Sequence, residues 1–137
     1  MRSHKHSPSS YARILFRYLG LSEENSQTYF DGTNLSYEEL MTLDGTIPRD
    51  DMLIVYRNAL AIYGRKDLGL SVGTQLNLPT HGPLGVAAFS GPDLRTALTL
   101  LAKYGQTRVE FFNTSVSENA AGLKISFAET FDLEDLR

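Results

Sequence analysis

The chain has 137 residues, enough for one compact domain but too few for an enzyme with a separate cofactor-binding domain. Its composition, 42% hydrophobic and 21% charged, is typical of a globular protein and excludes collagen-like and wholly disordered classes. A formal net charge of −3 gives no global positive field to attract nucleic acid. The lack of cysteine excludes disulfides, cysteine-ligated metal sites and cysteine nucleophiles.

The N-terminal residues predict a flexible tail. Residues 1–9 contain serine, histidine and proline without periodicity, and we expect His4 and His6 to be solvated rather than to bind metal. No apolar signal-peptide core is present, and the longest uncharged apolar run, Leu84–Phe89, is too short to cross a bilayer. We therefore expect a cytoplasmic protein with no membrane partner.

An amphipathic helix is predicted from Ser10. Its apolar residues follow the helical spacing i, i+3, i+4, i+7, i+8, and they are Tyr11, Ile14, Leu15, Tyr18 and Leu19. Gly20 provides a left-handed ending. Arg13 and Arg17 fall on the opposite face, where a solvated surface is favoured over a site for an anionic partner.

Capping signals predict the next two helices. Ser36 and Glu39 fit a capping box that opens a helix of about two turns. Pro48 fits the first turn of a longer helix that ends at Gly64, with acidic residues near its N-terminus to complement the helix dipole.

Glycine and proline mark the helices that follow. A helical segment is predicted over 67–76, where Gly69 and Gly73 suggest close backbone packing. Two similar starts, His81-Gly82-Pro83-Leu84 and Ser90-Gly91-Pro92-Asp93, each place proline for a first helical turn. The second start leads into a helix through Tyr104.

Beyond Gly105 the apolar spacing changes from helical to alternating. Residues 108–111 and 123–128 predict two strands, and 118–122 is a loop of hairpin length, so we expect antiparallel pairing. A hairpin alone is marginally stable and must pack on the helices or on further strands. The predicted fold class is α+β, with a mostly helical N-terminal two-thirds packed on a C-terminal antiparallel β-hairpin or small sheet. The acidic end, 132–137, is typical of a helix start, so we expect residues 10–137 to be a truncated single domain.

One motif suggests nucleophilic catalysis. Residues 69–73 match G-x-S-x-G, in which a strand-to-helix turn exposes a serine, here Ser71, to a base. A helix start precedes this serine, and no carboxylate lies between it and His81. A small serine hydrolase using Ser71 is therefore a less favoured alternative.

Neither a metal nor a cofactor is expected. His81 is the only histidine beyond the tail, which excludes two-histidine metal sites, and no nucleotide-phosphate loop motif occurs. His81 itself is more readily explained by a hydrogen bond to the backbone than by contact with a ligand.

Aromatic residues suggest a pocket. Tyr56, Tyr63 and Tyr104 each bring a hydroxyl to an apolar helix face, and apolar walls with a few polar groups are typical of small-molecule sites. Our candidate ligand-binding residues are Tyr56, His81 and Tyr104.

Four segments occur in a recognisable order: an "IP" helix start (47–50), LGL-x-x-G (68–73), GxLG (82–85) and AL-x-x-L-x-x-Y (97–104). Together they make the chain resemble the arabinose-binding-type N-terminal domain of AraC/XylS-type transcription regulators. The resemblance covers about residues 10–137.

The resemblance implies a sensor that binds a small-molecule effector, forms a homodimer and does not act as an enzyme. It also implies that DNA is bound by a separate C-terminal helix-turn-helix domain, because residues 1–137 have no recognition-helix pattern of their own. The effector's identity does not follow from the family name. A stand-alone protein-interaction module is the alternative from another class.

Overall fold

The computed structural model describes residues 6–42, 44–108, 110–130, 132–133 and 136, and its contacts divide the chain into two compact units. The first unit extends to Leu76 and the second begins at Asn77. The described residues are mostly helical and form two small antiparallel sheets of two strands each, which confirms the α+β class. The single truncated domain over residues 10–137 stays a prediction.

The first residues of this unit that the structure describes form a strand. Strand β1 (His6–Pro8) pairs antiparallel with β2 (Thr46–Pro48), and Ser7 lies opposite Ile47. Ser7 and Ile47 are both buried. The predicted flexible tail is therefore wrong for residues 6–8, which gain a pairing partner forty residues along the chain that local composition does not reveal. Residues 1–5, including His4, lie outside the described part.

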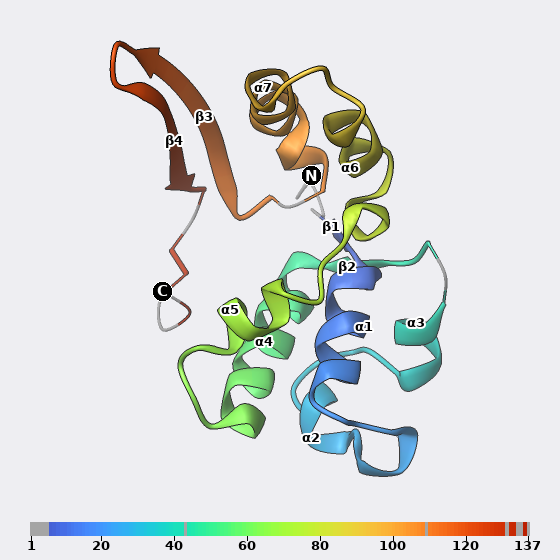
Figure 1. The fold of residues 1–137 in the computed structure, drawn as a ribbon. Coiled ribbons are helices and arrows are strands. Elements are labelled where there is room, and N and C mark those ends of the chain that lie inside the picture. The colour runs from blue at the N-terminus through green and yellow to red at the C-terminus, as the bar shows by residue number, and fades with distance from the viewer. Residues whose placement is uncertain (1–5, 43, 109, 131, 134–135, 137) are drawn as a thin grey trace, which may run out of the picture. The chain divides into compact units, whose positions relative to one another are not determined.

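The remaining elements of the first unit are helical (Figure 1). They are α1 (Ser9–Tyr18), the 3₁₀ turn η1 (Glu23–Asn25), α2 (Gln27–Phe30), α3 (Tyr37–Met41), α4 (Arg49–Tyr63) and α5 (Leu68–Gly73). The core that they share is built around large, fully buried side chains: Phe16, Tyr29, Leu40, Ile47, Met52 and Val55.

Tyr29 shows how this core accommodates polar atoms. Its side chain is fully buried, and its hydroxyl donates to the backbone oxygen of Ala12 at 2.7 Å. The rings of Phe16 and Tyr29 pack edge to face, with their centroids 5.2 Å apart. Burial of the phenol, reinforced by nearby Tyr56, raises the pKa of Tyr29, so its hydroxyl remains a donor.

Helix α1 ends as predicted but presents a different face. Gly20 is left-handed, with φ 67°, and the N–H groups of Gly20 and Leu21 donate to the carbonyls of Arg17 and Phe16, which forms a Schellman motif. Of the predicted inward set only Leu15 is buried, and the buried stripe is rotated to include Ser9, Ala12, Arg13 and Phe16.

Arg13 corrects the prediction of a solvated basic face. It is 9% exposed, and its Nη1 donates to the carbonyls of Leu40 and Thr42, both at 2.9 Å, and to the Ser9 hydroxyl at 3.3 Å. Helix α3 ends at these carbonyls. Arg13 thus satisfies C-terminal carbonyls of a neighbouring helix, a partner that spacing along α1 cannot indicate.

The predicted capping box of α3 is confirmed. Ser36 Oγ accepts from the Glu39 N–H, and Glu39 accepts in return from the Ser36 N–H at 2.8 Å. Helix α3 stops at Met41, so it is shorter than the two turns expected. The predicted first-turn position of Pro48 is wrong, because Pro48 ends β2 and α4 begins at Arg49, whereas left-handed Gly64 ends α4 as predicted.

The glycines of α5 are not close-packing positions. A Cβ atom at Gly69 or Gly73 would have no neighbour within 4 Å, so the expectation of close backbone packing there is wrong. Close approach occurs instead in the second unit, where a Cβ atom at Gly85 would lie 2.3 Å from the Leu78 carbonyl oxygen. Gly82, with φ 60°, supplies the positive φ that starts the same helix.

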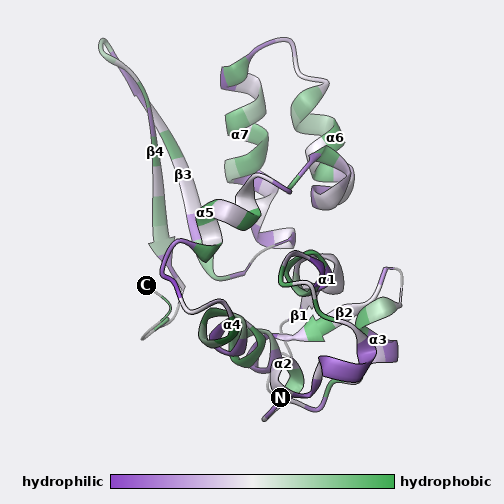
Figure 2. Cartoon of the chain, turned by 60° about the horizontal axis from the view of Figure 1, so that its bottom comes forward, coloured by the Kyte–Doolittle hydropathy of each residue, from purple (hydrophilic) through white to green (hydrophobic). Residues whose placement is uncertain are grey.

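The second unit consists of short helices and a hairpin. Its elements are η2 (Leu78–His81), α6 (Gly82–Phe89), α7 (Leu94–Tyr104), η3 (Gly105–Thr107), β3 (Phe112–Asn119) and β4 (Gly122–Glu129). Hydrophobic residues make up much of α6 and α7 (Figure 2). Pro83 occupies the first turn of α6 as predicted, whereas Pro92 lies outside α7, whose N-cap is Asp93.

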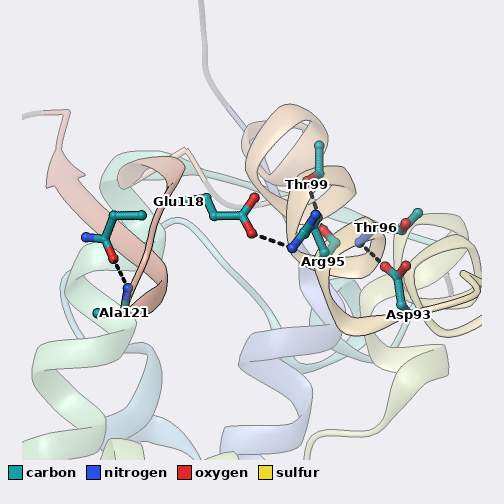
Figure 3. Close-up of polar contacts among 7 residues, drawn as sticks. Asp93, Arg95, Thr96, Thr99, Glu118 and Ala121 are labelled. Carbon is teal, nitrogen blue, oxygen red and sulfur yellow. Dashed lines mark hydrogen bonds and ion pairs between the residues drawn. The ribbon is translucent and has the colours of Figure 1, made fainter.

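A C-terminal antiparallel hairpin forms as predicted and packs against α7, but its first strand was misplaced: β3 begins at Phe112, directly after the predicted strand 108–111. Pairing continues to Asn119 opposite Gly122, so only two residues form the turn instead of the expected five. Arg95 of α7 pairs with Glu118 of β3, and the Asp93 carboxylate accepts from the Thr96 N–H at 2.7 Å (Figure 3). The helix start predicted at 132–137 lies mostly outside the described residues.

Candidate functional site

In the first unit, helices α1 and α4 pack against each other along a seam lined with tyrosines. At one end of the seam, burial raises the pKa of Tyr56, and the nearby Tyr11 raises it further. Seven residues further along each helix, the rings of Tyr18 and Tyr63 meet with centroids 6.1 Å apart. Because seven residues make about two helical turns, these pairs lie on the same faces of α1 and α4.

Helix α5 contacts the seam at the end where Tyr18 and Tyr63 meet. The hydroxyls of Tyr63 and Ser71 lie 3.3 Å apart and share a hydrogen bond. The Arg65 guanidinium lies 5.6 Å from the centre of the Tyr63 ring and pairs with Asp67 just before α5. Ser71 therefore has a tyrosine as its hydroxyl partner.

A hollow of about 250 Å³ lies at this same end of the seam, beside Tyr18. Four side chains line it: Ile14, Arg17 and Tyr18 from α1, and Gln75 from the residues after α5. Together they offer an aliphatic surface, a guanidinium, a phenol and a carboxamide. We call this feature the Arg17 hollow.

The two arginines of α1 make this end of the unit positive. Burial lowers the pKa of Arg13, the Arg17 charge lowers it further, and the carboxylate of Asp44 opposes both effects. The hydrogen-bond acceptors described for Arg13 are uncharged oxygens. The charge of Arg17 therefore lies beside a second guanidinium, and an anion would be attracted there.

The sequence-predicted residues belong to different units. Tyr56 is a half-buried residue of α4 in the first unit, whereas His81 and Tyr104 lie in the second. Tyr104, at the end of α7, is 43% exposed, and the Lys103 ammonium lies 5.2 Å from the centre of its ring. That Tyr56, His81 and Tyr104 share a ligand site stays a prediction.

His81 precedes α6, at the loop-to-helix junction where the sequence places it. Partial burial and the neighbouring Arg108 charge lower its pKa, so the imidazole is neutral at pH 7. Arg108 donates to the Thr80 carbonyl at 3.1 Å and packs against Gly82.

The serine motif has the wrong local structure for a nucleophile elbow. Ser71 lies inside α5 rather than on a turn between a strand and a helix. Within the described ranges, no group of three or more His, Cys, Asp or Glu residues could hold a metal ion. Sequence reasoning missed Gln75 and the hollow because α1 and the end of α5 are brought together only by folding.

Comparison with known protein families identifies the class of this domain. Residues 25–137 match a family described as "Arabinose-binding domain of AraC transcription regulator, N-term". The match covers most of the chain and defines a ligand-sensing regulatory domain. The chain therefore belongs to this family of AraC-type N-terminal domains.

A curated relative agrees with this assignment. The chain is 31% identical over 97 residues to the ornithine utilization regulator of Pseudomonas aeruginosa. The aligned region covers 71% of this chain and 29% of the relative, so the chain spans less than a third of that protein's length. In the part of the chain that the structure describes, no helix is long and apolar enough to cross a membrane.

Proposed function

We propose that this chain is the sensor of a transcription regulator, in which a small metabolite binds and thereby controls a DNA-binding domain located outside residues 1–137. The family match supports the sensing role. The observation that carries the proposal is the Arg17 hollow, a small cavity at the end of the seam whose lining combines an aliphatic side chain with three polar ones.

The mechanism requires the ligand to distinguish two states. An effector that binds both arrangements of a regulator equally well shifts neither, so the occupied site must favour one arrangement. Helices α1, α4 and α5 meet around the seam, and a ligand that draws Tyr18, Tyr63 and Gln75 together would stabilise one packing of these helices. The regulatory, non-catalytic role follows from the same proposal.

Titration calorimetry of the chain tests this function. The compounds are short fatty acids, sugars and amino acids, including ornithine because of the relative's name. We expect saturable binding by one class without turnover. Absence of binding by every class would refute the sensing role, and turnover abolished by Ser71→Ala would indicate the hydrolase.

Tyr56, His81 and Tyr104 stay our proposed ligand contacts from the sequence. Phe variants of the two tyrosines and His81→Gln should weaken the response if these residues touch the effector. If Tyr56→Phe and Tyr104→Phe leave every ligand response unchanged, the proposed contacts are wrong and binding in the Arg17 hollow is favoured.

Dimerisation is a second proposed role. Large apolar side chains are exposed in the second unit, notably Phe89 at 74%, Leu94 at 71% and Phe127 at 67%. Exposed apolar patches are typical of interaction surfaces. Sedimentation velocity over a concentration series, with and without ligand, measures this role, and a dimer that forms regardless of ligand would favour the protein-interaction module.

A further inference from the structure

The Arg17 hollow combines one positive charge with uncharged surroundings. Its lining contains Ile14, Arg17, Tyr18 and Gln75, and none of these is acidic. We propose that the hollow binds a small carboxylate that carries no ammonium group, with its carboxylate paired to the Arg17 guanidinium. This inference rests on the proposed sensing function and names the ligand class and the site.

Arg17 is available for such a ligand. It is exposed, and its guanidinium makes no hydrogen bond or ion pair with any residue that the structure describes. The end of α1 does not require it as a cap, because the N–H groups of Gly20 and Leu21 already satisfy the carbonyls of Arg17 and Phe16, at 3.0 and 3.3 Å. A planar guanidinium matches a carboxylate with two parallel hydrogen bonds.

The other lining groups favour the same ligand class. The hydroxyl of Tyr18 has no hydrogen-bond partner among the described residues, so it can donate to the second carboxylate oxygen or to a 2-oxo group. The carboxamide of Gln75 can donate as well, and Ile14 supplies apolar contact. The volume, about 250 Å³, is below the range of about 300–1,000 Å³ typical of drug-sized ligands, so a short-chain acid fits best.

The same lining disfavours amino acids. An ammonium group needs a carboxylate or several carbonyl oxygens, and Asp67, the acid that precedes α5, is engaged by Arg65. Arg13, one turn before Arg17, adds a second positive charge. Ornithine, with two ammonium groups, is therefore expected to bind poorly here.

Calorimetry with matched compounds tests the proposal on residues 1–137. The acids are hexanoate, benzoate and 4-methyl-2-oxopentanoate, the neutral analogues are hexanamide and benzamide, and the cationic comparisons are leucine and ornithine. We expect at least one acid to bind, its amide to bind at least about tenfold more weakly, and the affinity to fall as salt rises.

Variants locate the site. Arg17→Gln should raise the Kd of the acid about tenfold or more, and Arg17→Lys should have a smaller effect because it keeps the charge but not the planar fork. Lys124→Gln, which removes one positive charge from exposed β4, is the matched control and should leave the Kd unchanged. Gln75→Leu provides a second test within the hollow, and circular dichroism verifies that each variant is folded.

The outcomes separate this inference from the sensing function. If acids bind and Arg17→Gln has no effect, the assigned site is wrong. If amides, sugars or ornithine bind and the acids do not, the ligand class is wrong but the sensing function stands. If no compound of any class binds, both proposals are overturned.

Discussion

Arg13→Met removes the contact that ties α1 to α3 while preserving most of the side-chain volume. In the native protein, one guanidinium nitrogen donates to the carbonyls of Leu40 and Thr42, both at 2.9 Å, and to the Ser9 hydroxyl at 3.3 Å. Methionine keeps an apolar stem but offers no donor. We expect the first unit to lose stability without losing its fold.

The size of the loss follows from what each acceptor can recover. Leu40 is fully buried, and an unsatisfied buried carbonyl costs about 1–3 kcal/mol. Thr42 is exposed, so its carbonyl can turn to water and loses only about 1 kcal/mol. Burial of the Arg13 charge is itself unfavourable, as its lowered pKa indicates. Methionine removes this desolvation cost, which offsets part of the loss. The net decrease in the free energy of unfolding should be about 2–3 kcal/mol.

Urea unfolding followed by far-UV circular dichroism measures the change, and amide hydrogen exchange assigns it to α1 and α3. Arg17→Met is the matched control, because it changes the same residue type one turn later in α1 at an exposed position without hydrogen bonds. It should cost less than about 1 kcal/mol, the contribution of a charge near a helix C-terminus. Equal losses in the two variants would refute the capping role of Arg13.

Gly85→Ala should destabilise the second unit by about 1–3 kcal/mol, because its Cβ would lie 2.3 Å from a backbone oxygen of η2, whereas Gly73→Ala should be neutral or stabilising; thermal melts of the two variants give the comparison. Tyr29→Phe should cost about 1 kcal/mol in urea unfolding, since it removes the buried hydrogen bond from the phenol to the Ala12 carbonyl, and a neutral result would contradict the bond. The folded-state pKa of His81 is lowered, so the unfolded chain takes up the proton first, and stability should fall as pH drops below about 6.5. His81→Gln should flatten this slope, and an unchanged pH profile would show that the histidine is not its source.

Features that depend on residues within a few positions were predictable from the sequence. The capping box of Ser36 and Glu39 and the left-handed endings at Gly20 and Gly64 need only their own turns, and all are present. Alternation located the second strand of the hairpin correctly, but it placed the first strand at 108–111, whereas β3 covers Phe112–Asn119, a more polar segment, because strand pairing tolerates polar residues at exposed positions.

Features that depend on residues distant in the sequence were not predictable from it. Spacing shows that α1 is amphipathic but does not determine which residues are most deeply buried, and the stripe through Ala12 and Phe16 is selected by Tyr29, which bonds to one and packs on the other. Likewise, Gly73 and Gly85 look equivalent in sequence. Only the position of η2 makes Gly85 the glycine with no room for a side chain.

One part of the candidate site was likewise predictable from the sequence and another part was not. A tyrosine-lined helix face was predictable from Tyr56 and Tyr63, but the hollow needs Gln75, which lies more than fifty residues from Arg17 in sequence. No local pattern links these two residues. Their proximity depends on how α1 and α5 pack in the first unit.

Arg13 and Arg17 carry the same signal in the sequence, two arginines four residues apart on one helix, yet their surroundings assign them different roles. Three oxygens of the protein accept from Nη1 of Arg13, so removal of this side chain should lower stability. Arg17 lines a hollow, so its removal should be felt as lost affinity. Measuring both quantities for both variants distinguishes a structural arginine from a ligand-binding one, because a merely basic surface would make the two variants behave alike.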